Sequence, residues 1–390
     1  MLPSDSIIDF VEREKNSIIS LLEKLVLIDS GSQNIAGIMQ VAEIIAAELG
    51  ELGFENSLYE FKQAGPNLVS KRQGESEPFI ILLGHMDTVF DSNAQKKNPF
   101  RKENGKIYGP GALDMKGGIV QIVYALKVLK HFKKHKYGIK VILVGDEESG
   151  HPNSNALELF NNEAREALCV FCCEFGRTNN QIVLERKGVG TLTLEVWGRS
   201  AHSGNELAAG RNAVAELSRQ IVKIDSLYTD PQAEITASID IIEGGTAVNV
   251  VPDRAKGIFD IRFSQDKSLE DFVEHVKIIA AKPHKDNLKT EVSYHKEYPP
   301  MVKSDKSIKL LHFVSHLSEK NGFGVLKGIS VGGGADSTFF SALGIPTICS
   351  FGPVGENAHT YDEFIYEKDF FERIVLLADC LINIDQAVFD

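Results

Sequence analysis

Phe79-Ile80-Ile81-Leu82-Leu83-Gly84-His85-Met86-Asp87 is the stretch of sequence that decides the fold. Its first five residues are apolar and a glycine follows them, which is typical of a short strand buried on both faces of a sheet. His85 and Asp87 come directly after this strand. Because the carboxyl ends of parallel strands meet at one edge of an α/β sheet, ligand-binding groups are expected there.

Apolar strands of this kind alternate with helices along much of the chain. The spacing of apolar residues predicts helices over 7–25, 38–52 and 119–135, around 156–157, and after 307 and 369. Short apolar runs predict further strands over 139–144, 168–173 and 346–350. The alternation predicts an α/β fold in which helices flank a mostly parallel, mixed sheet.

The pattern changes near Glu185 and returns near Ser307. Residues 191–197 alternate between apolar and polar, as a half-exposed antiparallel strand does. Two helices and several more alternating strands follow. We therefore predict a catalytic domain formed by 1–186 and 297–390, interrupted by an inserted α+β domain at 187–296. An insertion of about 110 residues is an ordinary size for a domain.

Composition excludes several classes of partner. The 390 residues include 42 Lys+Arg and 54 Asp+Glu, so the formal net charge is −12. An acidic surface repels phosphate backbones and anionic membranes, which argues against nucleic acid and lipid as partners. The chain has no apolar run of about 18 residues that could span a membrane, and its N-terminus lacks the pattern of a secretory signal. Five cysteines in apolar contexts predict buried reduced thiols and a cytoplasmic location.

Histidines and carboxylates gather in five short clusters, each just after an apolar run. The clusters contain His85 with Asp87, Asp114, Asp146-Glu147-Glu148, Glu174, and His359. Imidazoles and carboxylates together are a ligand set for zinc. If Asp114 bridges two zinc ions, His85 and Glu174 can complete one site, and Glu148 and His359 the other. Three carboxylates and a hydroxide balance the charge of two Zn²⁺ ions, so the site can be buried.

Two acidic residues that lie next to candidate ligands in the sequence, Asp87 and Glu147, have different predicted tasks. Asp87 could hold the second ring nitrogen of His85, as partners of metal-binding histidines do. Glu147 should point away from Glu148, which leaves it free to take a proton from the attacking water and pass it to the leaving amine. Asp146 is expected to cap its loop.

Some of these clusters, taken alone, also fit a structural role, although Glu174 fits one less well because a buried carboxylate needs a partner. A single histidine at a strand end is often part of the core, and Asp-Glu-Glu before Ser-Gly is often a solvated turn. Cys169 and Cys172 have the spacing of half a zinc ribbon, but the second cysteine pair is missing, which favours core packing. The joint pattern points to metal chemistry more strongly than any of its parts.

These residues resemble the zinc exopeptidase and deacylase family of carboxypeptidase G, acetylornithine deacetylase, succinyl-diaminopimelate desuccinylase, aminoacylase and peptidase T. Among its branches, the glutamate carboxypeptidases of the carboxypeptidase G type are the nearest. The motifs that carry the resemblance run in order over nearly the whole chain: 84–89, 108–118, 146–148, Glu174, 198–204, 249–252, 260–262 and 332–336.

The resemblance implies roles for residues beyond the clusters. It implies two zinc ions with Asp114 bridging, Glu147 as general base, and a cis peptide bond between Asp114 and Met115. It also implies that the inserted domain is a lid and a dimer interface. His202 would then reach the active site of the partner subunit and stabilise the tetrahedral oxyanion.

Substrate binding is likewise implied by the resemblance. Asn249 and Arg262 would hold the free carboxylate of the substrate, a task that suits the guanidinium fork. A cross-strand ion pair is the alternative for Arg262. Without side chains, the loop around Gly333 would let the backbone approach the substrate closely, although an ordinary flexible turn also fits.

Residues and resemblance together predict a cytoplasmic two-zinc hydrolase, a homodimer, that releases a C-terminal amino acid from a peptide or N-acyl conjugate. Co²⁺ or Mn²⁺ could replace zinc at such ligands. The nearest alternative is a deacylase of N-acetyl- or N-succinyl-amino acids. An aminopeptidase is less favoured, because that branch tends to carry Asp where this chain has Glu174. A non-catalytic binding protein on the same fold would need neither a full ligand set nor Glu147.

Overall fold

The computed structural model describes residues 4–132 and 136–389 and separates into two compact units. Unit 1 comprises Met1–Leu184, Lys303–Ser330 and Ala335–Asp390, and unit 2 comprises Glu185–Val302 and Val331–Gly334. The insertion predicted at 187–296 falls inside the longer segment of unit 2.

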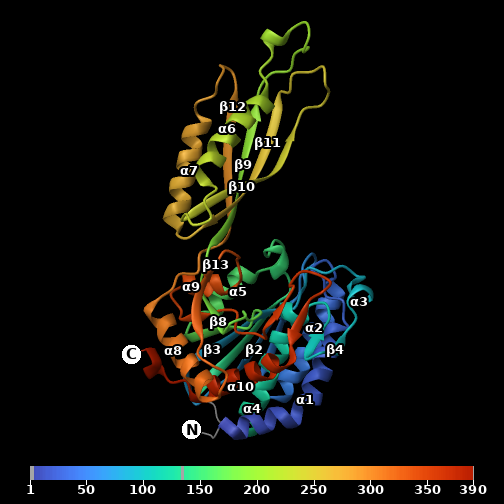
Figure 1. Ribbon diagram of the computed structural model, residues 1–390, viewed down its shortest axis with the longest axis vertical. Coiled ribbons are helices and arrows are strands. Elements are labelled where there is room, and N and C mark those ends of the chain that lie inside the picture. The colour runs from blue at the N-terminus through green and yellow to red at the C-terminus, as the bar shows by residue number, and fades with distance from the viewer. Residues whose placement is uncertain (1–3, 133–135, 390) are drawn as a thin grey trace. The chain divides into compact units, whose positions relative to one another are not determined.

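A six-stranded sheet forms the centre of unit 1 (Figure 1). Its strands, in spatial order, are β1 (Glu55–Tyr59), β2 (Asn67–Arg72), β6 (Tyr137–Val144), β3 (Ser76–His85), β7 (Ala167–Cys172) and β14 (Thr347–Ile348). The last four run parallel, whereas β2 is antiparallel to both of its neighbours. The predicted mostly parallel, mixed sheet is confirmed.

Helices cover this sheet, which explains why its central strands are mostly apolar. All eight residues of β6 are buried. α4 (Gly117–Phe132) contacts β3 and packs against α1 (Ser4–Val26) and α10 (Glu367–Asn383), while α2 (Ile35–Glu51) contacts β1 and β2. Beside β14 lie α8 (Asp305–Lys320) and α9 (Ser337–Ala342), and α9 also contacts α5 (Ala156–Glu163). The predicted helix over 119–135 is α4, and the part of that prediction at 133–135 lies outside the described residues.

Four further strands of unit 1 have only two or three residues each, too few to show a period in the sequence. A second sheet pairs β15 (Gly355–Glu356), β16 (Phe364–Tyr366), β5 (Lys106–Tyr108) and β4 (Arg101–Glu103), next to the short α3 (Ala94–Lys97). β8 (Gln181–Arg186) pairs with β13 (Lys327–Val331). The small second sheet matters for the site because the loop between β15 and β16 contains His359.

Unit 2 is an antiparallel sheet with two helices (Figure 1). The strand order is β10 (Ile235–Gly244), β11 (Arg254–Phe263), β9 (Gly188–Trp197) and β12 (Lys289–Tyr298), and α6 (Ala213–Tyr228) and α7 (Asp266–Ala280) complete its core. Along β11, buried residues alternate with more exposed ones, so the sheet covers its core with one face only.

All five cysteines are buried and free, which confirms the expectation of buried reduced thiols. Over residues 4–132 and 136–389, we find no helix that is both long and apolar enough to cross a membrane.

Candidate active site

Three neighbouring parallel strands deliver candidate ligands to one edge of the unit 1 sheet. His85 is the last residue of β3, Glu174 follows β7 and Glu148 follows β6. The other two candidates come from loops: Asp114 lies in the turn that leads into α4, and His359 lies between β15 and β16. Residues that are up to 274 positions apart in the sequence (359 − 85) therefore belong to one site.

The five side chains form two groups that share Asp114. In the first, Nε2 of His85 lies 3.1 Å from Oδ1 of Asp114 and 3.3 Å from Oε1 of Glu174. In the second, Nε2 of His359 lies 3.1 Å from Oδ2 of Asp114 and 3.6 Å from Oε2 of Glu148. Within each group the potential ligand atoms lie within 4.8 Å of one another.

This arrangement fits a pair of metal ions. Each carboxylate oxygen of Asp114 faces a different histidine, as a bridging ligand between two metals requires. Oε1 of Glu148 is buried and makes no hydrogen bond. One imidazole and two carboxylates in each group are donors of the type that Zn²⁺ binds.

The carboxylates of the two ligand groups carry an excess of negative charge, which raises the pKa values of several neighbouring groups. Burial tends to raise the pKa of Asp114, but hydrogen bonds with His359 and His85 hold it well below its usual value. The hydrogen bond between His359 and Asp114 raises the pKa of His359 to about 9. Burial, together with the charge of Asp114, raises the pKa of Glu148 to about 8, and the same two causes raise the pKa of Glu174. Protons therefore partly balance a charge that cations could balance instead.

Asp87 makes more contacts than the sequence predicted. Nδ1 of His85 lies 3.5 Å from the Asp87 carboxylate, but the main-chain oxygen of Asp87 is nearer, at 3.0 Å. The carboxylate itself accepts hydrogen bonds from the backbone N–H groups of Glu147 and Glu148, at 3.1 and 3.2 Å, and from the hydroxyl of Ser32, at 2.7 Å. Asp87 therefore holds the loop that carries Glu147 as well as the ring of His85.

Glu147 lies beside the ligand groups in a strongly acidic environment. Burial raises its pKa well above the usual value, and the charges of Asp336, Glu174 and Glu148 act in the same direction, against the opposing effect of His85. A carboxyl group with a raised pKa suits a general acid and base that works near neutral pH.

A buried histidine between two aspartates escaped the sequence analysis. His151 lies 2.9 Å (Nδ1) from Oδ1 of Asp146 and 2.6 Å (Nε2) from Oδ1 of Asp336. Asp146 also accepts a hydrogen bond from Ser154 at 2.9 Å, so its carboxylate does more than cap its own loop. A single histidine three positions after Glu148 has no spacing pattern that could have revealed this pairing.

Glu363 is a second residue that the sequence analysis missed. Its Oε1 accepts the backbone N–H groups of Leu113, at 2.7 Å, and of Asp114, at 3.3 Å. Burial raises the pKa of Glu363 to about 8. Its position four residues after His359 was the only signal in the sequence. Glu363 fixes the backbone on which Asp114 stands, and the Asp114–Met115 peptide bond in this turn is cis, as predicted.

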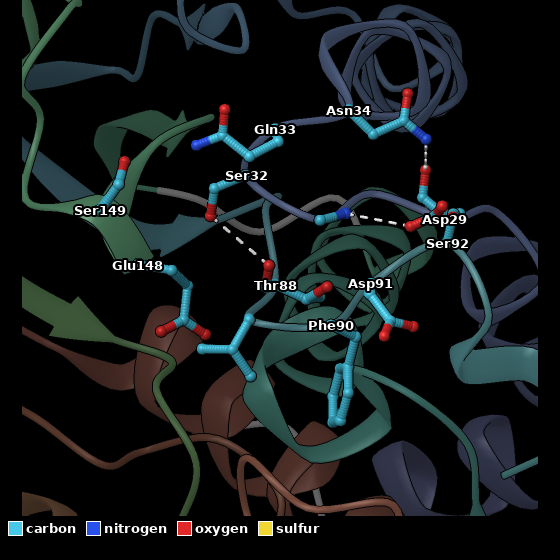
Figure 2. Close-up of a pocket in the computed structure, with 12 residues that line it drawn as sticks. Asp29, Ser32, Gln33, Asn34, Thr88, Phe90, Asp91, Ser92, Glu148 and Ser149 are labelled. Carbon is cyan, nitrogen blue, oxygen red and sulfur yellow. Dashed lines mark hydrogen bonds between the residues drawn. The ribbon is translucent and has the colours of Figure 1, made fainter. Parts of the chain in front are cut away.

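A cavity of ≈ 660 Å³ opens beside the second ligand group (Figure 2). The segments 29–34 and 88–92 form much of its wall, and Glu148 and Ser149 also line it. Figure 2 shows Glu148 and Ser149 on the side opposite Asp29 and Asn34. Because these lining segments are irregular loops, no sequence pattern predicted the cavity.

The predicted unit 2 residues do not gather at one place. His202 is exposed, and its Nδ1 accepts the backbone N–H groups of Gly204 and Asn205, both at 3.1 Å. In a neutral ring the proton is then on Nε2, so Nε2–H can donate a hydrogen bond. Asn249 is also exposed and is adjacent, since its main-chain oxygen accepts from the N–H of Ser203 at 3.0 Å.

Arg262 lies at the other end of the unit 2 sheet. It pairs in register with Val189 at the start of β9, whereas the loops of His202 and Asn249 lie beyond Trp197 at its end (Figure 1). Eight strand residues correspond to roughly 26 Å. Asn249 and Arg262 of one chain therefore lie too far apart to bind the same carboxylate, so the prediction that both hold it requires that they come from two different subunits.

The Arg262 guanidinium already has an anionic partner. Its Nε and Nη2 donate to the two oxygens of Asp260, at 2.7 and 2.8 Å, so the ion pair considered as an alternative is present, but within one strand. The loop of Gly333 is likewise held: Nη1 of Arg186 donates to the carbonyl oxygens of Gly333, at 2.9 Å, and Gly334, at 3.2 Å. The loop is not simply a flexible turn.

Comparison with known proteins identifies relatives of this chain. The sequence is 30% identical over 358 residues to carboxypeptidase G2 of Pseudomonas sp. (strain RS-16), covering 89% of this chain and 84% of that protein. It is 29% identical over 349 residues to a succinyl-diaminopimelate desuccinylase of Bradyrhizobium sp. (strain BTAi1), covering 82% and 87%.

Solved structures show the same fold. Aminopeptidase PepT from Bacillus cereus superposes with a TM-score of 0.80 at 22% identity, covering 96% of this chain and 98% of that one. An M20 family metallo-carboxypeptidase from Sulfolobus solfataricus superposes with a TM-score of 0.72 at 19% identity, covering 93% and 98%. The family described as peptidase family M20/M25/M40 matches residues 81–383, well over half of the sequence. This protein therefore belongs to peptidase family M20/M25/M40 and is a hydrolase of the metallopeptidase or amidohydrolase type.

Proposed function

We propose that this protein is a two-zinc carboxypeptidase that hydrolyses an amide bond and releases a C-terminal amino acid, such as glutamate, from a peptide or N-acyl conjugate. The observation that carries the proposal is the pair of ligand groups that share Asp114, with Glu147 beside them. The similarity to carboxypeptidase G2 supports the carboxypeptidase reaction.

His85, Asp114 and Glu174 would hold one metal ion, and Asp114, Glu148 and His359 the other. When bound, zinc ions supply Lewis acidity that polarises a carbonyl group and makes water more acidic. Glu147 takes a proton from the attacking water and delivers it to the nitrogen of the leaving amino acid. Asp87 holds Glu147 in place through its backbone N–H. The same nitrogen and oxygen donors would also accept Co²⁺ or Mn²⁺.

The cavity next to Glu148 is the proposed binding place for the acyl part of the substrate. Its volume of ≈ 660 Å³ lies within the range of small-molecule sites. Arg262 binds the terminal carboxylate of the substrate. Its guanidinium group either releases Asp260 to do so or pairs with both carboxylates at once. Arg186 orients the Gly333 carbonyl, so that the backbone of this loop can face the substrate.

His202 and Asn249 act in the active site of a second subunit. The distance of roughly 26 Å along β9 supports this assignment, because one substrate cannot contact both ends of the same sheet. Nε2–H of His202 donates a hydrogen bond to the developing oxyanion. A homodimer through unit 2 is supported by the edge strand β10, on which Ile241 and Ile242 are 49% and 60% exposed.

A deacylase of N-acyl-amino acids is the second candidate, favoured by the similarity to the desuccinylase. Both reactions use the same hydrolytic groups and differ in the acyl group that the cavity accepts. A non-catalytic binding protein would need neither five candidate ligands nor Glu147, which argues against this alternative. For the location we propose the cytoplasm, which the five free cysteines support.

A substrate panel tests these alternatives. The zinc-loaded protein is given dipeptides, acyl-glutamates, and N-acetyl- and N-succinyl-amino acids, and the released amino acid is quantified. A carboxypeptidase cleaves the dipeptides and acyl-glutamates, whereas cleavage of N-acetyl or N-succinyl compounds alone would indicate a deacylase. No cleavage, with fewer than one zinc per chain, would indicate a binding protein.

A further inference from the structure

We propose that His151 is a positioning residue, which locks the loop of Glu147 and Glu148 to the start of α9 through hydrogen bonds with Asp146 and Asp336. The proposal rests on the proposed function in one respect, namely that Glu147 is the general base. It assigns a task to a buried residue that is neither a candidate ligand nor a candidate base.

The contacts of the ring determine its hydrogen-bonding state. Burial tends to lower the pKa of His151, but Asp336 and Asp146 raise it well above its usual value, so both ring nitrogens donate, one to Asp146 and one to Asp336. The side chains of these three residues are only 1%, 3% and 4% exposed, so water does not compete for the donors. Such charge-assisted hydrogen bonds are short and directional.

The backbone transmits the position of this ring to Glu147. The N–H of His151 donates to the carbonyl oxygen of Asp146 at 3.1 Å, and the N–H of Gly150 donates to that of Glu147 at 2.9 Å. The loop therefore folds back on itself, and His151 is the residue that closes it. The rings of Phe160 and Phe339 pack edge-on against the imidazole, with centroids 5.8 and 6.4 Å away.

Two anchors thus hold the loop from different sides. Asp87 fixes the N–H groups of Glu147 and Glu148, and His151 fixes Asp146 and the end of the loop. Asp336, on the far side of the ring, is two residues after Gly334, whose carbonyl oxygen accepts from Arg186. One imidazole therefore joins Asp146, the residue before Glu147, to the residue at the start of α9.

A purely structural role does not account well for this cluster. Burying several charged groups is costly, and replacing such groups by apolar ones often leaves stability unchanged or improves it. Misplacing a catalytic group by about 1 Å, by contrast, can lower the rate by about 100-fold. The expected consequence of losing His151 is therefore a slower chemical step.

The test compares His151→Ala with the zinc-loaded wild type. We expect kcat to fall about 10- to 100-fold with little change in KM and with the metal content unchanged. Hydrogen–deuterium exchange of the metal-free protein provides a readout besides activity: backbone amides of 146–151 and of the start of α9 exchange faster in the variant.

Matched variants separate positioning from stability. Glu163→Gln replaces a different buried carboxylate, which lies 2.8 Å from the ammonium group of Lys71 and 3.3 Å from that of Lys140. This variant should lower the stability of the fold without changing kcat. Asp336→Asn keeps an acceptor for His151 and should retain more activity than Asp336→Ala, which also serves if His151→Ala does not fold. The double variant His151→Ala/Asp336→Ala should be no slower than the slower single variant.

Two results would overturn the proposal: an unchanged kcat in His151→Ala, or exchange rates at 146–151 equal to those of the wild type. A wild type that cleaves no substrate in the panel would refute the proposed function instead. In that case the exchange experiment still decides whether His151 holds the loop.

Discussion

Asp87 accepts a hydrogen bond from the backbone N–H of Glu147 at 3.1 Å, so the residue that faces the His85 ring also fixes the main chain of the proposed base. A carboxylate that binds backbone N–H groups can orient a neighbouring side chain without touching the substrate. The position of Glu147 is thus set from the end of a different strand, and this relationship leads to the first prediction.

Replacing Asp87 by Ala should lower kcat about 10- to 100-fold, the usual cost of losing a partner of a metal ligand. The variant frees the N–H groups of Glu147 and Glu148 and the Nδ1 side of His85. Steady-state kinetics at saturating substrate measure the effect. Ser32→Ala is the control, since it removes only the hydroxyl at 2.7 Å and should have a smaller effect. An equal loss in both variants would contradict this account.

Replacing Glu147 by Gln should lower turnover about 100- to 10,000-fold, the range of general acid–base catalysis. The amide has nearly the same size but cannot take a proton from water. Metal analysis of the purified variant should still find the wild-type amount of zinc, because Glu147 belongs to neither ligand group. Retained activity would remove Glu147 from the role of base.

The metal-free protein should become less stable as the pH rises from about 5 to about 9. His359 and Glu148 have folded-state pKa values of about 9 and about 8, above their ordinary values of 6.5 and 4.5. The folded state therefore holds these protons more tightly than the unfolded chain does, and this stabilisation is lost as the pH passes through the raised values.

Metal ions have to displace the same protons, so metal binding should strengthen over that pH range. Melting temperatures of metal-free and zinc-loaded protein, measured across it, should move apart as the pH increases. A gap that stays constant or narrows would show that these protons do not compete with the metal.

Mixing two inactive variants tests whether His202 acts in the partner subunit. His202→Ala and Glu147→Gln homodimers should each be nearly inactive. After subunit exchange, a heterodimer contains one site with both residues intact, and activity should reappear. A mixture that stays inactive although exchange is demonstrated, or a monomeric protein in solution, would refute the role in trans.

Replacing Arg262 by Ala should lower kcat/KM for substrates with a free terminal carboxylate about 10- to 100-fold. A hydrogen bond to a charged group contributes about 1.5–3 kcal/mol. Lys should rescue poorly, since it lacks the planar fork that two carboxylate oxygens require. The matching substrate amides provide the control, because their hydrolysis should hardly depend on Arg262. An equal loss for acids and amides would indicate that Arg262 only supports the sheet through Asp260.

The strand ends could be read from the sequence because each combines two local signals. β3 and β6 contain runs of consecutive apolar residues; His85 ends β3 and Glu148 follows β6, so rules for parallel sheets place both at one edge. His359 was found only as part of the joint pattern, since the strands on either side of it have two and three residues.

Other features depend on contacts that no local pattern records. His151 meets Asp336 across 185 positions, and Glu363 reaches the backbone of Leu113 across 250. The separation of Arg262 from Asn249, by contrast, follows from the length of β11, which begins after Asn249 and has Arg262 as its second-to-last residue. Long-range pairing is thus what the sequence leaves open here.

The ends of the long unit 2 segment are joined to each other by two backbone hydrogen bonds. The N–H of Arg186 donates to the oxygen of Met301 at 3.1 Å, and the reverse bond measures 3.0 Å. All five candidate ligands belong to unit 1. The stretch between these two residues can therefore be regarded as an exchangeable cassette. A short linker could replace it without stretching the remaining chain. Grafting the corresponding segment of a relative would leave the five candidate ligands untouched, so any change in substrate choice could be attributed to unit 2.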